Sequence, residues 1–154
     1  MAVKSRRFKA VLSTSVMAAA LLGGGLATAP AAAAAEPRPG FQIFYGADCA
    51  TAYRTYTGPT RTGEIRKEAW INDTFNASSA SSPGYGERIY DNAASARIQP
   101  RTRVAIVDSA DRVWWASNSS YSTSRCVNLA WGFGNVNIRN DNDEFRVTAY
   151  NTQV

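Results

Sequence analysis

The chain has 154 residues, 45% of them hydrophobic and 19% charged, with 17 basic and 12 acidic residues and no histidine. The lack of histidine excludes His-based catalytic triads, His-ligated zinc and imidazole general bases. The basic surplus is misleading, because four basic and no acidic residues lie in the first 35 positions. The remainder has 13 basic against 12 acidic residues, a net charge of +1, so we expect no nucleic-acid partner.

Residues 1–35 are predicted to be a secretory signal peptide. Basic residues at positions 4–9 precede an apolar run over 11–29, and small residues continue to Ala35. The spacing Ala33-x-Ala35 is typical of a signal peptidase site, so we expect a secreted, extracellular protein. An arginine pair leaves twin-arginine export open beside the general route. A membrane-spanning helix is the alternative, which the glycine triplet in the run disfavours.

Removing 35 of 154 residues leaves 119, enough for one domain with one core. Residues 36–40, EPRPG, form a proline-rich lead-in, and the domain is predicted over 41–154. No polybasic segment remains that could bind anionic lipid, so we expect no membrane association after cleavage. We also expect the protein to be a monomer.

Cys49 and Cys126 are the only cysteines. An even pair in an exported protein indicates a disulfide, with two buried free thiols as the alternative. A bridge closing this loop would stabilise the fold by roughly 4.5 kcal/mol.

The domain is predicted to be all-β. Short runs of β-branched and aromatic residues alternate with turn residues at a spacing typical of an antiparallel sandwich. A helical turn or two is expected only over 63–73, where like residues recur four apart. The expected strands are 41–45, 52–58, 88–91, 96–99, 103–109, 112–117, 125–131, 136–139 and 144–150.

A repeat organises these strands. The segment IYDNAASARI at 89–98 is echoed 49 residues later by IRNDNDEFRV at 138–147. The simplest arrangement is two related Greek-key motifs, over about 41–100 and 101–150, whose turns face the same end of one sandwich.

Several large side chains are expected to fill the space between the motifs, namely Trp70, Trp114, Trp131 and Phe145. Trp114 and Trp115 must point to opposite faces of their strand. One of the two is therefore predicted to be core, and the other covered at an edge or exposed.

The first echo segment, Asp91-Asn92-Ala93-Ala94-Ser95-Ala96, resembles the N/D-N/D-x-x-S/T-S calcium motif of microbial βγ-crystallins. Tyr56-Thr57-Gly58 is similar to the aromatic-x-Gly corner of that family. The likeness covers residues 41–150 as two motifs. It departs from the family pattern at Ala96, at the second copy, which has Glu144-Phe145 in place of the Ser/Thr-Ser pair, and in the lack of a second corner.

The resemblance implies calcium sites where the loops of the two motifs meet. Position by position, Asp91, Asn92 and Ser95 would serve one site, and Asn140 and Asp141 the other. Glu144 does not match the family, although a carboxylate there could replace the hydroxyl. The alternative is that both segments are Asx-turns whose side chains bond their own backbone.

Catalytic patterns are weak. Glu64 and Glu68 could share a helical face as an acid–base pair, but a solvated turn is the simpler interpretation. Asp108-Ser109-Ala110 superficially resembles an aspartic protease turn, which would need a second such triplet. We therefore expect no enzymatic activity.

The resemblance leaves two functions open. One is a secreted, non-catalytic βγ-crystallin-like domain that binds calcium or is purely structural. The other is a targeted binder, because streptomycete relatives of this fold include peptidase inhibitors and antifungal, killer-toxin-like proteins. Its partner would be a secreted peptidase or cell-wall polysaccharide, contacted by aromatics around one turn-rich region, namely Trp114, Trp115, Tyr121 and Trp131.

Overall fold

The computed structural model describes residues 37–61, 63–130 and 137–152, whose regular secondary structure is β-strand apart from one short 3-10 turn. The predicted signal peptide and Trp131 lie outside the described residues. No described helix is long and apolar enough to cross a membrane. The elements are β1 Gly40–Phe44, the short 3-10 turn η1 Ala47–Cys49, β2 Tyr53–Thr57, β3 Arg66–Ala69, β4 Ser95–Ile98, β5 Thr102–Val107, β6 Val113–Asn118, β7 Arg125–Asn128 and β8 Glu144–Ala149.

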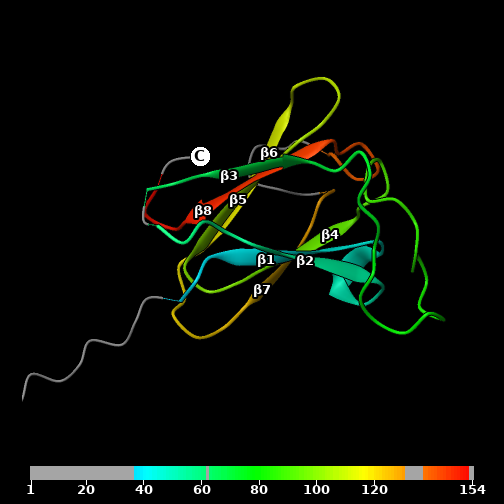
Figure 1. Ribbon diagram of the computed structural model, residues 1–154, viewed down its shortest axis with the longest axis horizontal. Coiled ribbons are helices and arrows are strands. Elements are labelled where there is room, and N and C mark those ends of the chain that lie inside the picture. Colours follow the sequence, from blue (N-terminus) through cyan, green and yellow to red (C-terminus); the bar gives the residue numbers. More distant parts are fainter. Residues whose placement is uncertain (1–36, 62, 131–136, 153–154) are drawn as a thin grey trace, which may run out of the picture. The chain divides into compact units, whose positions relative to one another are not determined.

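The strands form two four-stranded antiparallel sheets (Figure 1). Sheet A has the order β2-β1-β4-β7 and sheet B the order β3-β8-β5-β6. If β1 to β4 are matched in chain order with β5 to β8, the two orders correspond strand for strand. Each half therefore contributes its first, second and fourth strands to one sheet and its third strand to the other sheet. Neither sheet can form from one half alone.

Strand alternation separates buried from exposed side chains on the edge strand β6 of sheet B. On β6, Trp114 is fully buried while its neighbour Trp115 is 41% exposed. Trp114 lies opposite Ile106 of β5, and Trp115 lies opposite Ala105. This confirms that one tryptophan of the pair is core and the other is not, as the pleat requires.

The two sheets meet around Phe145 of β8. Its ring lies 5.1 Å from the ring of Phe41, 4.5 Å from that of Tyr56 and 5.6 Å from that of Trp70. All four side chains are buried, and edge and tilted ring contacts add to the stabilisation that burial gives. Burial, followed by the hydrogen bond that its hydroxyl donates to Asp73, raises the pKa of Tyr56.

The helix predicted over 63–73 is wrong. Residues Arg66–Ala69 form β3, which pairs antiparallel with Glu144–Val147 of β8. The open edge of β8 supplies hydrogen bonds that a four-residue pattern cannot reveal, so the tertiary partner overrides the local preference. The expected helical face shared by Glu64 and Glu68 is lost with it; Glu68 pairs with Arg66 instead.

Two further predicted strands are not strands. In 88–91 only Arg88 makes a β-bridge, to Thr74, and the chain then turns. In 136–139, position 136 lies outside the described residues, and the rest is a loop in which the Ile138 N–H donates to the carbonyl of Leu129. Both short segments lead into the echoing turns. Their backbone groups form turn hydrogen bonds instead of the regular hydrogen bonds of a β-sheet.

The disulfide is confirmed. Cys49 and Cys126 are bridged, with 6.1 Å between their Cα atoms, and tie η1 to the edge strand β7. Beside the bridge, the Asp48 N–H donates to Asn128 Oδ1 at 2.8 Å, and Asn128 Nδ2 donates to Asp48 Oδ1 at 2.8 Å. A covalent link between the halves thus reinforces the strand exchange.

The core can be tested with one substitution at two positions. Ile106 is fully buried, whereas Ile71 is 63% exposed. We expect Ile106→Ala to lower the free energy of unfolding by about 2–5 kcal/mol, because it removes buried methylenes and leaves a cavity. Ile71→Ala should change it by less than about 0.5 kcal/mol. Chemical denaturation measures both, and equal losses would contradict the assignment of the core.

Candidate site at the paired turns

The two echoing turns lie against each other and bond reciprocally. The Asp91 N–H donates to the carbonyl of Asn142 at 3.3 Å, and the Asn140 N–H donates to the carbonyl of Ala93 at 3.0 Å. Asp91 and Asn140 are 49 positions apart in the sequence, as are Ala93 and Asn142. Each turn therefore donates one backbone hydrogen bond to the other turn and accepts one from it, at equivalent positions.

The turns also have the same internal shape. The Asn92 N–H donates to the carbonyl of Ile89 at 3.0 Å, and the Asp141 N–H donates to the carbonyl of Ile138 at 3.2 Å. Asp91 has φ 58° and Asn140 has φ 55°. Asp and Asn are the non-glycine residues that best tolerate this left-handed conformation, which explains the acid or amide at this position in both copies.

Asn142 locks the junction from inside. Its side chain is fully buried, and its Nδ2 donates to the carbonyls of Ala93 at 3.2 Å and Ile138 at 3.1 Å. Its Oδ1 accepts from the Ala93 N–H at 3.4 Å. One buried amide thus makes three hydrogen bonds to backbone groups of both turns, so its own polar atoms are satisfied.

Carboxylates converge beside this amide. Burial raises the pKa of Asp143, and the charges of Asp91, Asp141 and Asp108 raise it further, although its interaction with the Tyr90 hydroxyl opposes this. The Asp143 charge in turn is the main cause of the raised pKa of Tyr90. The Asp143 Oδ1 atom is buried and has no hydrogen-bond partner among the described residues. The junction is thus short of positive charge.

Arg112 supplies part of that charge. Its Nε lies 2.6 Å from Asp108 Oδ2, and its Nη2 lies 2.8 Å from Asp141 Oδ2. The Ser109 hydroxyl donates to Asp141 Oδ1 at 3.0 Å. Asp108 Oδ1 also accepts the N–H groups of Ala110 and Arg112. Asp108 therefore has a structural role in the β5–β6 turn.

The other predicted ligands have varied surroundings. Asn92 donates from Nδ2 to the carbonyl of Tyr90 at 3.1 Å, so its side chain bonds its own turn, although in the opposite direction to the Asx-turn bond. The Ser95 hydroxyl donates to the carbonyl of Gly46 at 2.6 Å and accepts the Cys49 N–H.

Glu144 lies 3.1 Å from Lys67 Nζ and 3.0 Å from Arg146 Nη2. Although burial acts to raise the pKa of this carboxyl, the hydrogen bonds and charges of Lys67 and Arg146 outweigh it and lower the pKa.

The structure thus brings Asp91, Asn140 and Asp141 to one junction, while Ser95 and Glu144 are engaged elsewhere. No three histidine, cysteine or carboxylate groups of the described chain lie close enough together to hold a metal by themselves. Sequence reasoning missed Asn142, Asp143, Tyr90 and Arg112. The echo itself could have suggested Asn142 and Asp143, since they follow the aligned acid–amide pair.

Comparison of the chain with protein-family models, with curated proteins and with solved structures finds no match.

The junction can be tested at Asn142. We expect Asn142→Asp to lower the free energy of unfolding by about 2–3 kcal/mol, because an isosteric carboxylate loses both donated bonds and faces two carbonyls. Asn137→Asp is the matched control, since exposed Asn137 bonds the described residues only through its oxygen, which accepts the Arg139 N–H at 3.1 Å. Thermal and denaturant unfolding of both variants would show the difference, and an unaffected Asn142→Asp would refute the lock.

Proposed function

We propose that this chain is a secreted, non-catalytic domain of the βγ-crystallin type, built as a sandwich of two Greek-key motifs, which binds calcium where its paired turns meet. The observation that carries the proposal is the reciprocal bonding of the two turns beside the Asp91, Asp141 and Asp143 carboxylates.

Strand order supports the fold assignment. In each sheet the first, second and fourth strands of one half are joined by the third strand of the other half. Two Greek-key motifs that exchange one strand produce this order, and the 49-residue repeat is the expected sequence correlate. The Cys49–Cys126 disulfide supports secretion, because such bonds persist in oxidising compartments.

The chemistry of the junction suits a hard cation. Calcium takes six to eight oxygen ligands with flexible geometry, including carboxylates, carbonyls and water. Asp91 is exposed, and Asp143 has one buried oxygen without a partner among the described residues. These two carboxylates would hold the ion, with Asn92 and Asn140 beside them, and carbonyls and waters would complete the shell. Bound calcium would supply a positive charge that joins the two turns.

Proton competition follows from the raised pKa of Asp143. Without calcium, this carboxyl favours the folded state most below its unfolded pKa, and that contribution is lost as pH rises through the raised folded pKa. Calcium acts in the opposite sense, because it binds the ionised form. The apparent calcium affinity should therefore fall as the medium becomes acidic.

We expect calcium at a hundredfold excess over its Kd to raise the free energy of unfolding by about 2.7 kcal/mol. Asp91→Asn should weaken binding at least tenfold. Asp143→Asn should abolish it while raising the melting temperature in chelator, since it removes a poorly solvated charge. Asp111→Asn is the control, because Asp111 is exposed and has the same φ of 58° as Asp91.

Calorimetric titration gives the affinity, and scanning fluorimetry the melting temperature. A melting curve that millimolar calcium leaves unchanged in the wild-type protein would refute the calcium proposal without affecting the fold assignment.

A second candidate function is surface binding to cell-wall polysaccharide without turnover. Trp115 and Val113 are each 41% exposed on β6, and with Arg103 and Ala105 they line a shallow hollow of about 200 Å³. An aromatic ring on a rigid strand beside a basic side chain can stack on a sugar ring. Tyr121 is more exposed, but its ring stacks with Arg101.

This candidate predicts that the protein sediments with insoluble cell wall or chitin, and that Trp115→Ala reduces the bound fraction severalfold. The Ile71→Ala variant, which changes an exposed apolar residue that does not line the hollow, should sediment like the wild type. Failure to sediment, together with stoichiometric slowing of a secreted peptidase, would favour the inhibitor alternative.

A further inference from the structure

Arg112 contacts two acidic residues that belong to different loops. Asp108 lies in the β5–β6 turn, and Asp141 lies in the second of the paired turns. Their Oδ2 atoms lie 2.6 Å and 2.8 Å from two nitrogens of the same guanidinium group. One positive charge therefore stands between two negative charges at the point where these two loops meet.

Each of the two carboxylates is held through one oxygen and directs the other toward Arg112. Asp108 Oδ1 accepts the N–H groups of Ala110 and Arg112 at 3.0 Å and 2.8 Å. Asp141 Oδ1 accepts the Ser109 hydroxyl at 3.0 Å. Asp108 is only 2% exposed, and its buried Oδ2 has no hydrogen-bond partner among the described residues, so the charge of Arg112 balances it. Carboxylates that bind metal ions are commonly fixed by neighbouring hydrogen bonds in this way.

The first half has no cation at the equivalent place. The Tyr45 N–H donates to the carbonyl of Ala52 at 3.0 Å, just before β2 begins. The Asp108 N–H donates to the carbonyl of Arg112 at 3.1 Å, just before β6 begins. Ala52, which is fully buried, therefore takes the position of Arg112, and Tyr45 takes that of Asp108.

The acids and the arginine thus occur together in the second half and are absent together from the first. Asp141 follows Asn92 by 49 positions, so a neutral amide takes its place in the first turn. Two carboxylates around one guanidinium leave a net negative charge, which a divalent ion would balance in full. Calcium accepts carboxylate and hydroxyl oxygens at about 2.3–2.6 Å, and water completes its shell.

We propose that Arg112 is a built-in substitute for a second calcium ion, and that its guanidinium occupies the position in which the second turn would otherwise hold one. This inference rests on the calcium function proposed above, and it assigns the limit of one ion per domain to a single side chain. A tethered cation acts at a high effective concentration, which a free ion must overcome. The Arg112 side chain is 50% exposed, so an ion from solvent can reach the position once the guanidinium is removed.

Arg112→Gln tests the inference, because it removes the positive charge and keeps a polar side chain. We expect calorimetric titration to give two calcium ions per domain for this variant, against one for the wild type. In chelator the variant should melt at a lower temperature than the wild type, because buried Asp108 keeps its charge without a partner. Calcium should therefore raise its melting temperature by more than it raises that of the wild type. An arginine that served only as a structural salt bridge would lower stability in the variant without adding an ion.

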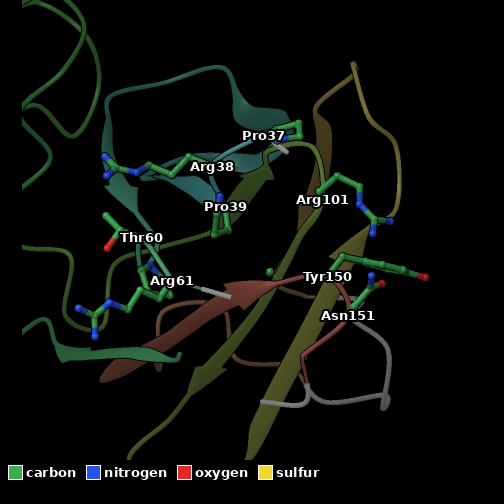
Figure 2. A pocket seen from close by; sticks show the side chains of 10 residues that line it. Pro37, Arg38, Pro39, Thr60, Arg61, Arg101, Tyr150 and Asn151 are labelled. Carbon is green, nitrogen blue, oxygen red and sulfur yellow. The ribbon is translucent and has the colours of Figure 1, made fainter. Parts of the chain in front are cut away.

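Two further variants separate the position from its charge. Arg38→Gln makes the same change in net charge before the first residue of β1, whereas Phe44 at the other end of β1 accepts the Ala94 N–H of the first turn. Arg38 is exposed, and Figure 2 shows its guanidinium pointing away from the neighbouring pocket. This variant should bind one ion. Asp108→Asn combined with Arg112→Gln removes a ligand together with the arginine, so it should also bind one ion and should melt above Arg112→Gln in chelator.

One ion in both the wild type and Arg112→Gln would overturn the inference and leave the proposed function intact. Two ions in Arg38→Gln or in the double variant would overturn it too, because uptake would then follow net charge or another group. Failure of Arg112→Gln to fold at millimolar calcium would also overturn it, since an ion at this position would balance both carboxylates. If the wild type binds no calcium, the proposed function fails by itself. Uptake of one ion by Arg112→Gln would then still support the inference, and uptake of none would overturn it.

Discussion

The fold depends on two backbone hydrogen bonds exchanged between turns that lie 49 residues apart. The N–H groups of Asp91 and Asn140 each donate to the opposite turn, and β4 and β8 begin shortly after these turns in different sheets. Fixing the turns therefore fixes the relative position of the two sheets at one end. Each bond contributes only about 1 kcal/mol net. Its larger effect is geometric, since the buried Asn142 amide can satisfy three polar groups only when both turns are in place.

Local patterns predicted most of this architecture. Alternating β-branched and aromatic residues identified seven of the eight strands to within a few residues, and the repeat predicted that the two turns would face the same end of the sandwich. The exceptions depend on distant partners. β3 has a helical spacing and becomes a strand because the edge of β8 is open. The segment 88–91 has the pattern of a strand, yet its last residue, Asp91, lies in the turn and donates its N–H to the carbonyl of Asn142. Neither partner can be inferred from neighbouring residues.

The candidate site was predictable only in part for the same reason. The acid–amide pairs at 91–92 and 140–141 were visible, because the left-handed turn position favours Asp and Asn. Whether a predicted ligand side chain is engaged by another partner depends on long-range packing. Ser95 is held by the loop after β1, Glu144 by Lys67, and Asp141 by Arg112.

The two halves match in strand order but differ in how they hold their first hairpins. Ser95 and Glu144 occupy equivalent positions, paired with Phe44 and Val107. The first hairpin is fastened by the Ser95 hydroxyl and the disulfide, whereas the second is fastened by Arg112 between Asp108 and Asp141. Arg112 thus already pairs with two carboxylates of the second half, those of Asp108 and Asp141. Under the calcium proposal, the charge left for an added cation belongs to Asp91 and Asp143, which favours one ion per domain despite two copies of the turn.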